Sequence, residues 1–181
     1  MKFFSKTALS AVAVILVLSI AGCNLFLSEG NASDESDESE PIEIAGEWYE
    51  SEHESGLTIT DSTIEFTDDG SVWQTCKIVD FSNEQFNGGE SGEGNCGYAV
   101  LHYTEPSSSI ESDAQDKYGI LRWQNLTDSG MEYAEGTKGT DTDGDGWWDS
   151  YTYFDTAREA KNSMTESDGF FSMYSAIDVA Q

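Results

Sequence analysis

The stretch DSTIEFTDDGS, residues 61–71, decides the fold class of this chain. Its apolar residues, Ile64 and Phe66, alternate with polar neighbours, which is the period-two pattern of a half-buried β-strand. Asp69 and Gly70 follow at once, and an Asp-Gly pair after such a run predicts a two-residue hairpin turn. We therefore expect a strand that turns back directly into an antiparallel partner.

The same rhythm continues along the chain, where short β-branched and aromatic runs are separated by Gly, Asp, Asn and Ser. Many short strands with frequent turn residues are typical of antiparallel barrels and sandwiches. We therefore predict a mainly β fold, a small antiparallel β-barrel or sandwich. The expected strands are GEWYE (46–50), LTIT (57–60), TIEFT (63–67), VWQTCKIV (72–79), GYAVLHY (97–103), YGILRWQNL (118–126), GMEYAEG (130–136), YTYFD (151–155) and FFSMY (170–174).

One short helix is expected near the C-terminus, over residues 157–164. Asp155 or Thr156 would serve as its N-cap, because both side chains accept hydrogen bonds from the first free N–H groups of a helix. Ala160 and Met164 would give the helix a narrow apolar face toward the sheet. The folded β-domain is expected to span residues 46–181.

The opening of this domain, Gly46-Glu47-Trp48, is similar to the first strand of lipocalins and other calycins. In those barrels the tryptophan closes one end of the core, and the spacing of the next strands also looks lipocalin-like. The resemblance implies a β-barrel with a generic role in binding a small or apolar ligand, and it assigns no ligand residues. The arginine that packs on this tryptophan in lipocalins has no counterpart after Arg158.

The N-terminus carries two lysines, an apolar run and then Ile20-Ala21-Gly22-Cys23. The run is too short for a membrane-spanning helix and fits the apolar region of a signal peptide. Small residues before a cysteine resemble the lipobox of bacterial lipoproteins. That resemblance implies a signal peptide at 1–22 and acyl chains such as palmitate on Cys23; an ordinary secretory peptide is the alternative. Asn24 is not an inner-membrane retention signal, which favours an outer-membrane lipoprotein of the cell envelope.

The chain is strongly acidic, with 8 Lys+Arg against 35 Asp+Glu and a net charge of −27. Such a surface excludes nucleic acid as a partner, because phosphate contacts need clustered basic residues. It would also be repelled by anionic lipid headgroups, so any membrane contact is expected through the lipid on Cys23. Residues 23–45 are rich in Ser, Glu and Asp and predict an acidic disordered tether. We expect the protein to be monomeric.

Two further cysteines, Cys76 and Cys96, remain when Cys23 is lipidated. The exported location implied by the lipoprotein resemblance favours a disulfide between them. A zinc site is the alternative, but no histidine lies at ligand spacing from the two cysteines.

The stretch DTDGDGWWD, residues 141–149, places acidic side chains at alternate positions around two glycines, a pattern suited to Ca²⁺. Its spacing resembles the EF-hand-like loops of thrombospondin type 3 repeats. Thr152 stands where an EF-hand carries a bidentate Glu, which predicts moderate affinity and a structural role for calcium. A solvated acidic turn without metal is the alternative. The expected ligands are Asp141, Asp143, Asp145, the carbonyl of Trp147, Asp149 and Asp155.

The sequence carries none of the motifs of nucleophilic, metal-dependent or phosphate-binding catalysis. We therefore expect no enzyme activity, although abundant carboxylates leave a two-acid hydrolase open. The leading hypothesis is a lipid-anchored lipocalin-like domain that binds a small or apolar ligand, with a calcium-stabilised loop. The alternative is a calcium-dependent surface module that binds glycan or protein through an exposed tryptophan.

Lipid attachment at Cys23 gives the first testable prediction. Wild-type protein exported by a bacterial host should incorporate an alkyne-labelled fatty acid and partition with membranes. Cys23→Ser should lose both properties, because the thiol that accepts the lipid is gone, whereas the control Cys96→Ser should keep them. Fatty-acid label retained on Cys23→Ser would contradict the assignment.

Overall fold

The computed structural model describes residues 40–50, 54–105, 112–146 and 148–180. Residues 40–181 form one compact unit, which contains the whole barrel. Cys23, the signal peptide 1–22 and Trp147 lie outside the described residues.

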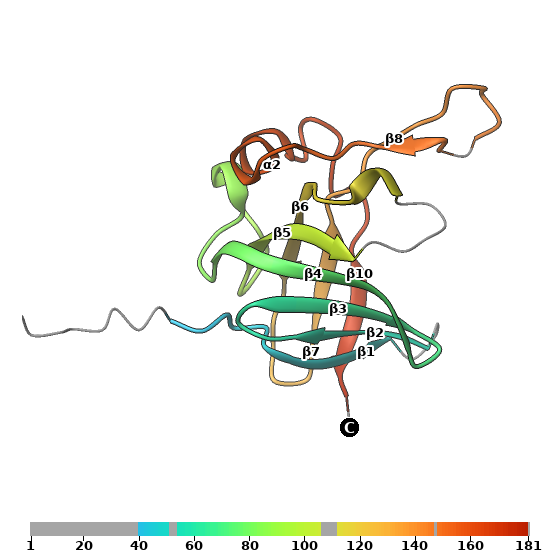
Figure 1. The fold of residues 1–181 in the computed structure, drawn as a ribbon. Helices are drawn as coiled ribbons and strands as arrows, with labels where there is room; N and C mark the ends of the chain where they lie inside the picture. Colours follow the sequence, from blue (N-terminus) through green and yellow to red (C-terminus); the bar gives the residue numbers. More distant parts are fainter. Residues whose placement is uncertain (1–39, 51–53, 106–111, 147, 181) are drawn as a thin grey trace, which may run out of the picture. The chain divides into compact units, whose positions relative to one another are not determined.

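Eight antiparallel strands form a closed barrel, so the fold is the predicted barrel and not a sandwich (Figure 1). Each strand pairs with its neighbours in sequence, except that an excursion separates β7 from β10 and β10 then closes the barrel against β1. This meander is the architecture that the resemblance to lipocalins implies. The strands are β1 (Gly46–Glu50), β2 (Ser55–Ile59), β3 (Thr63–Asp68), β4 (Ser71–Ser82), β5 (Gly97–Glu105), β6 (Tyr118–Gln124), β7 (Gly130–Glu135) and β10 (Ser175–Val179).

The hairpin between β3 and β4 has the predicted two-residue turn. Asp69 and Gly70 both adopt positive φ, 46° and 71°. Two successive positive φ values define a type I′ turn, whose twist matches that of the flanking strands. The alternation is confirmed as well, because Ile64 and Phe66 are buried while Glu65 between them is only partly covered.

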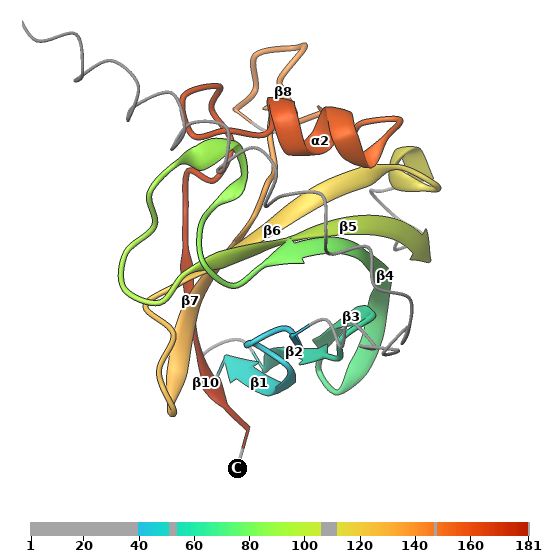
Figure 2. The same ribbon diagram turned by 90° about the vertical axis from the view of Figure 1, so that its left-hand side faces the viewer.

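The excursion between β7 and β10 contains a small hairpin and the predicted helix (Figure 2). The hairpin pairs β8 (Gly139–Thr140) with β9 (Ser150–Tyr151), and the helix is α2 (Ala157–Ser163). Thr156 is the N-cap, since its hydroxyl accepts a hydrogen bond from the backbone N–H of Glu159. Within the described ranges, no helix is long and apolar enough to cross a membrane.

The expected last strand, FFSMY at residues 170–174, is wrong, because the strand that closes the barrel is β10, one segment later. Phe170 and Phe171 are buried against the outer side of the barrel, and Phe171 has a φ of 58° that no strand adopts. The expected strand at 151–155 is likewise shorter than predicted, since only Tyr151 lies in β9. Aromatic runs are equally suited to covering a sheet and to lying within it. Pairing with partners far away in sequence therefore decided where the strands lie.

The barrel interior is filled with large side chains, including Trp123, Tyr103 and Leu101, which are almost fully buried. Ile42 and Ile44 join this core from the segment before β1, so the folded unit begins earlier than the expected residue 46. The indole Nε1 of Trp48 donates a hydrogen bond to the carbonyl of Ile44 at 2.9 Å. Trp48 thus closes one end of the core, as the lipocalin resemblance implies.

A second cluster covers the outer face of β5 and β6, beneath α2 and the loop before β10. The side chain of Arg122, which is 0% exposed, packs against this cluster through Phe171. The guanidinium lies 3.9 Å from the ring centroid of Phe171 and donates to Glu90 at 2.5 Å and to the Asn87 side chain at 2.6 Å. Stacking and charge-assisted hydrogen bonds offset part of the cost of its desolvation.

The predicted disulfide is wrong, since Cys76 and Cys96 are not bonded to each other. Cys76 lies opposite Tyr103 on β5, whereas Cys96 directly precedes the first residue of that strand. The length of β5 therefore separates the two positions by roughly 23 Å, the span of about seven extended residues. A disulfide requires Cα atoms within about 7 Å.

This separation predicts two reduced thiols in protein that carries Cys23→Ser. Alkylation after denaturation without reductant should add two labels, measured by intact mass, because Cys76 and Cys96 cannot reach each other in the fold. A reducing agent should leave the Tm unchanged. A single bridged species without labels would contradict the observed register of β4 and β5.

The buried guanidinium gives a stability prediction. Arg122→Ala should lower the free energy of unfolding by about 3–5 kcal/mol, because it leaves Glu90 and Asn87 without their buried partner. Arg158→Ala is the matched control, since Arg158 is exposed on α2, and its effect should stay within about 0.5 kcal/mol. Denaturant unfolding monitored by circular dichroism measures both. If Arg122→Ala and Arg158→Ala lowered the free energy of unfolding equally, the contacts of Arg122 with Glu90 and Asn87 would not stabilise the fold.

Candidate functional site

The candidate site joins the aspartate loop to a pocket at one end of the barrel, and Trp148 belongs to both. The loop is the tip of the β8–β9 hairpin, which continues from β7. Trp148 packs on Gly139, where an added Cβ would come within 2.0 Å of the indole. The indole also meets the ring of Tyr151 edge-on at 5.6 Å. These contacts fix the indole against the hairpin although 45% of the residue stays exposed.

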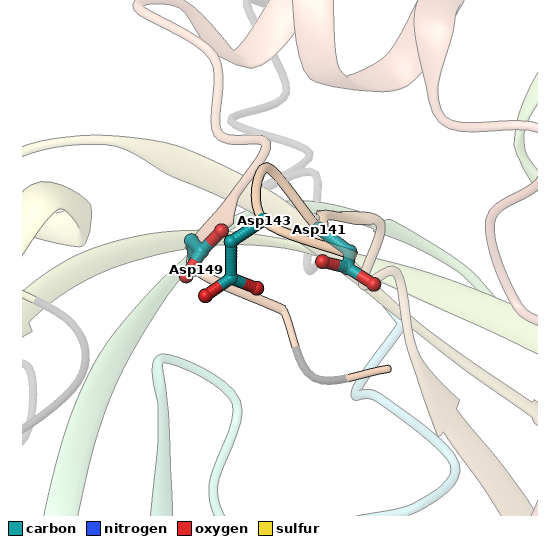
Figure 3. Close-up of side chains that lie close together, drawn as sticks. All are labelled: Asp141, Asp143 and Asp149. Carbon is teal, nitrogen blue, oxygen red and sulfur yellow. The ribbon is translucent and has the colours of Figure 1, made fainter. Parts of the chain in front are cut away.

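Three of the predicted calcium ligands lie together in the loop (Figure 3). Asp141, Asp143 and Asp149 each offer a carboxylate oxygen, and these oxygens lie within 4.8 Å of one another. All three side chains are exposed to solvent. Like charges this close repel, and a divalent cation between them would reverse the sign of that interaction.

Backbone N–H groups of the loop hold the carboxylates in place. Asp141 accepts from Gly144 at 2.7 Å and from Gly146 at 2.9 Å, and Asp143 accepts from Asp145 at 3.2 Å. Gly144 and Gly146 have φ values of 79° and 92°, which an L side chain would adopt only with strain. A carboxylate has about four acceptor positions, so these bonds leave oxygen lone pairs available for a cation.

Asp149 ties the two sides of the loop together. Its Oδ2 accepts from the backbone N–H of Thr142 at 2.6 Å. This bond to Thr142 holds the pKa of the Asp149 carboxyl below its ordinary value. A lowered folded-state pKa contributes stability above the ordinary aspartate range and loses it as the pH falls through the lowered value. Asp149 is therefore anionic at neutral pH.

The remaining predicted ligands do not join this group. Asp145 is not one of the three clustered carboxylates. Asp155 is not in this group either, and its carboxylate forms an ion pair with the ammonium of Lys117 beside β6. Asp155 follows β9, and the fold directs the chain there back toward the barrel, where Phe154 bridges to Tyr118. The expected carbonyl donor at position 147 lies outside the described residues.

The pocket beside the loop has a volume of about 280 Å³. It lies at the barrel end formed by the β3–β4 hairpin, the last residues of β7 and the first of β10. Its larger lining side chains are four aromatic residues, one methionine and one acid; the other positions are Ala, Thr and Ser. The six are Phe66, Trp73, Tyr133, Trp148, Met173 and Glu135.

Trp73 reaches the pocket because of a register irregularity in β4. Phe66 pairs with Gln74 and Thr67 pairs with Val72, so Trp73 is the extra residue between them. A β-bulge of this kind redirects a side chain and is common next to functional sites. The Trp73 ring lies 5.6 Å from that of Phe66 and remains 39% exposed.

Glu135 is the only charged side chain among the described residues of the pocket wall. One of its oxygens accepts a hydrogen bond from the Tyr103 hydroxyl at 2.5 Å. Burial and the Glu135 charge raise the pKa of Tyr103 well above its ordinary value, so its hydroxyl stays protonated and donates. Burial, followed by the charges of Glu50 and Glu135, raises the pKa of Tyr133 to about 12. The pocket therefore combines aromatic side chains with one carboxyl group.

The opposite barrel end has a second depression of about 450 Å³, beside Trp48 and the β6–β7 turn. Its wall includes Glu43, Glu47 and Asp128, and Trp48 is already engaged with Ile44. This end contains one aromatic lining residue among those described, whereas the other contains four. The β8–β9 end is consequently the better candidate for ligand binding.

The sequence predicted a role for an exposed tryptophan of the loop but gave no indication of Trp73, Tyr133 and Glu135 as site residues. Their strands were predicted, yet a strand pattern does not show which side chains gather at a barrel end. The bulge that redirects Trp73 became visible only with the pairing of β3 and β4.

Comparisons with protein-family models, curated proteins and solved structures found no match to this chain. The class of the protein is therefore given by its architecture, a closed eight-stranded antiparallel barrel that is compatible with ligand binding. Its candidate site is defined by the chain's own residues.

Proposed function

We propose that this protein is a lipid-anchored lipoprotein of the bacterial cell envelope whose β-barrel binds a small ligand in the aromatic pocket. The observation that carries this proposal is the pocket itself. Four aromatic side chains from β3, β4, β7 and the β8–β9 loop converge on about 280 Å³. Ligand sites are concave, mainly apolar and supplied with a few polar groups, and volumes of about 300–1,000 Å³ are usual for drug-sized ligands. A pocket of this size suits a compact molecule.

The filled interior supports a site at the barrel end and not in its centre. A hollow barrel would hold its ligand in the centre. Here that space is occupied by core side chains, including Trp123, Tyr103, Ile42 and Ile44. A ligand that entered the centre would have to displace these side chains, which costs their packing energy. The pocket needs no such displacement, since Trp73 and Trp148 are already partly open to solvent.

Calcium has a structural role in this proposal. Asp141, Asp143 and Asp149 would bind Ca²⁺ together with backbone carbonyls and water, because calcium requires six to eight oxygens. With three clustered carboxylates the affinity would be on the order of 10⁻⁴ M or weaker, which suits an exterior location. Asp149 directly follows Trp148, so a cation that fixes the carboxylate also fixes the indole that lines the pocket.

The lipid anchor would act through the lipidated Cys23 and the acidic residues that follow it. The chain enters the barrel past Glu43, which lines the depression beside Trp48 at the end opposite the aromatic pocket. The acyl chains would hold the protein on the membrane while the negatively charged barrel stays in solution. The proposed location is the outer membrane, on its periplasmic or surface face.

A calcium titration tests the loop. Calcium at a hundredfold excess over its Kd should stabilise the protein by about 2.7 kcal/mol, which raises the Tm by roughly 10 °C. Tryptophan emission should change in parallel, because Trp148 is the neighbour of Asp149. Asp143→Asn should remove both effects, since it keeps the side-chain shape and removes one charge.

The matched control for this titration is Asp113→Asn, which removes the same charge from an exposed position outside the loop. It should respond to calcium as the wild type does. Magnesium at the same ionic strength should give no comparable shift, because it demands a tighter octahedral site. If Asp143→Asn and Asp113→Asn responded equally, the effect of calcium would be charge screening, and the proposed calcium site would be wrong.

The second candidate is a calcium-dependent surface module that binds glycan or protein. The exposed Trp148 beside the acidic cluster favours it, as does the filled interior. The two candidates differ in which residues the bound molecule contacts. A small ligand should protect Tyr133 and Trp73 from hydrogen exchange and quenching, whereas a glycan or protein partner should protect the hairpin tip and depend strictly on calcium.

A further inference from the structure

We propose that the aromatic pocket is specific for an organic cation, a small alkylated ammonium group. This inference rests on the proposed function, because it names the ligand class of the same pocket. It is carried by the combination of four aromatic rings, one carboxylate and no basic residue among the described lining side chains.

Four aromatic rings line one small volume. Phe66 and Trp73 are inclined to each other by 50° at 5.6 Å, so their faces are not closed by mutual stacking. Tyr133 comes from β7 across the barrel end, and Trp148 comes from the hairpin. Ring faces carry negative quadrupolar charge and attract cations, most strongly when the cation is partly desolvated. Walls of several aromatic rings are the usual site of alkylated ammonium groups.

Glu135 supplies the counter-charge. The side chain is only partly exposed, and Tyr103 donates to one of its oxygens at 2.5 Å, which fixes the carboxylate at the pocket wall. A partly buried anion favours a cationic ligand over a neutral one, because the charge it meets is screened less than at the surface. An anionic ligand is disfavoured by the same group, and no described lining residue would compensate it.

The net charge of the whole chain also favours a cationic ligand. A net charge of −27 raises the local concentration of cations and speeds their encounter with the protein. This field alone selects any cation, including Na⁺ and Ca²⁺. The aromatic wall supplies the discrimination, because weakly hydrated alkylammonium groups lose less on leaving water than small inorganic ions do.

Met173 is the remaining large side chain among the described lining residues of the pocket. It is 80% exposed and lies two residues before β10, and Ser172 and Ser175 also line the pocket. An unbranched thioether adapts its shape to apolar groups and contacts aromatic rings favourably. Such a side chain can cover the methyl groups of a bound cation without a rearrangement of the barrel.

The test uses the full chain with Cys23→Ser and measures binding of choline and tetramethylammonium by calorimetry. Sodium chloride at equal concentration controls for ionic strength. The neutral isostere 3,3-dimethylbutan-1-ol has the shape of choline without its charge. Choline should bind saturably, and the isostere should bind at least about tenfold more weakly.

Two variants and one control locate the site. Glu135→Gln should weaken choline binding about tenfold while retaining an acceptor for Tyr103, whereas Glu65→Gln, which removes the same charge from the outer face of β3, should leave it unchanged. Trp148→Leu should weaken binding comparably because it keeps apolar volume and removes the ring. Trp148 lies on an exposed hairpin, so this variant remains informative if Glu135→Gln does not fold.

The outcomes separate this inference from the proposed function. Equal binding of choline and its isostere, or equal effects of Glu135→Gln and Glu65→Gln, would overturn the cation specificity and leave a general ligand pocket. Binding of neutral sugars without binding of choline would also overturn the cation specificity and leave a general ligand pocket. If neither cations nor neutral molecules bound the folded protein, the ligand-binding function would fail as well.

Discussion

The structure depends on closure of the barrel around an interior that its own side chains fill. β10 pairs with β1 on one side and with β7 on the other, so no strand edge within the barrel remains open. Trp123 and Tyr103 take up the centre, and Trp48 with Ile44 closes one end. A barrel filled in this way can present a ligand site only where the packing stops, which is the end formed by the β3–β4 hairpin and the start of β10.

The excursion between β7 and β10 converts that end into a site. It leaves the barrel after Glu135, forms the β8–β9 hairpin, passes through α2 and returns at β10. Its return path covers the outer face of β6, where Arg122 is held by Glu90 and stacks on the ring of Phe171. The chain that follows the hairpin is thereby packed against the barrel wall. Within the hairpin, Trp148 lines the pocket and the next residue, Asp149, belongs to the carboxylate cluster.

Acidity has two distinct consequences in this molecule. Most of the carboxylates among the described residues are exposed. The large negative charge of the chain favours solubility and attracts cations. A few are placed by specific bonds: Asp149 by Thr142, Glu135 by Tyr103 and Glu90 by Arg122. Composition alone cannot identify these acids, because nothing in the sequence distinguishes them from the other Asp and Glu residues.

The sequence by itself determined the mainly β class, the β3–β4 turn, the α2 helix with its N-cap narrowed to Asp155 or Thr156, and the loop containing Asp141 and Asp149. Each of these is encoded within about ten residues, through period-two alternation, turn conformation or capping. Only the tertiary structure decided the position of β10, the separation of Cys76 from Cys96, the diversion of Asp155 to Lys117 and the pocket of Trp73, Tyr133 and Glu135. These features depend on strand register and on which barrel end a side chain reaches, and both are set by pairing between segments distant in sequence.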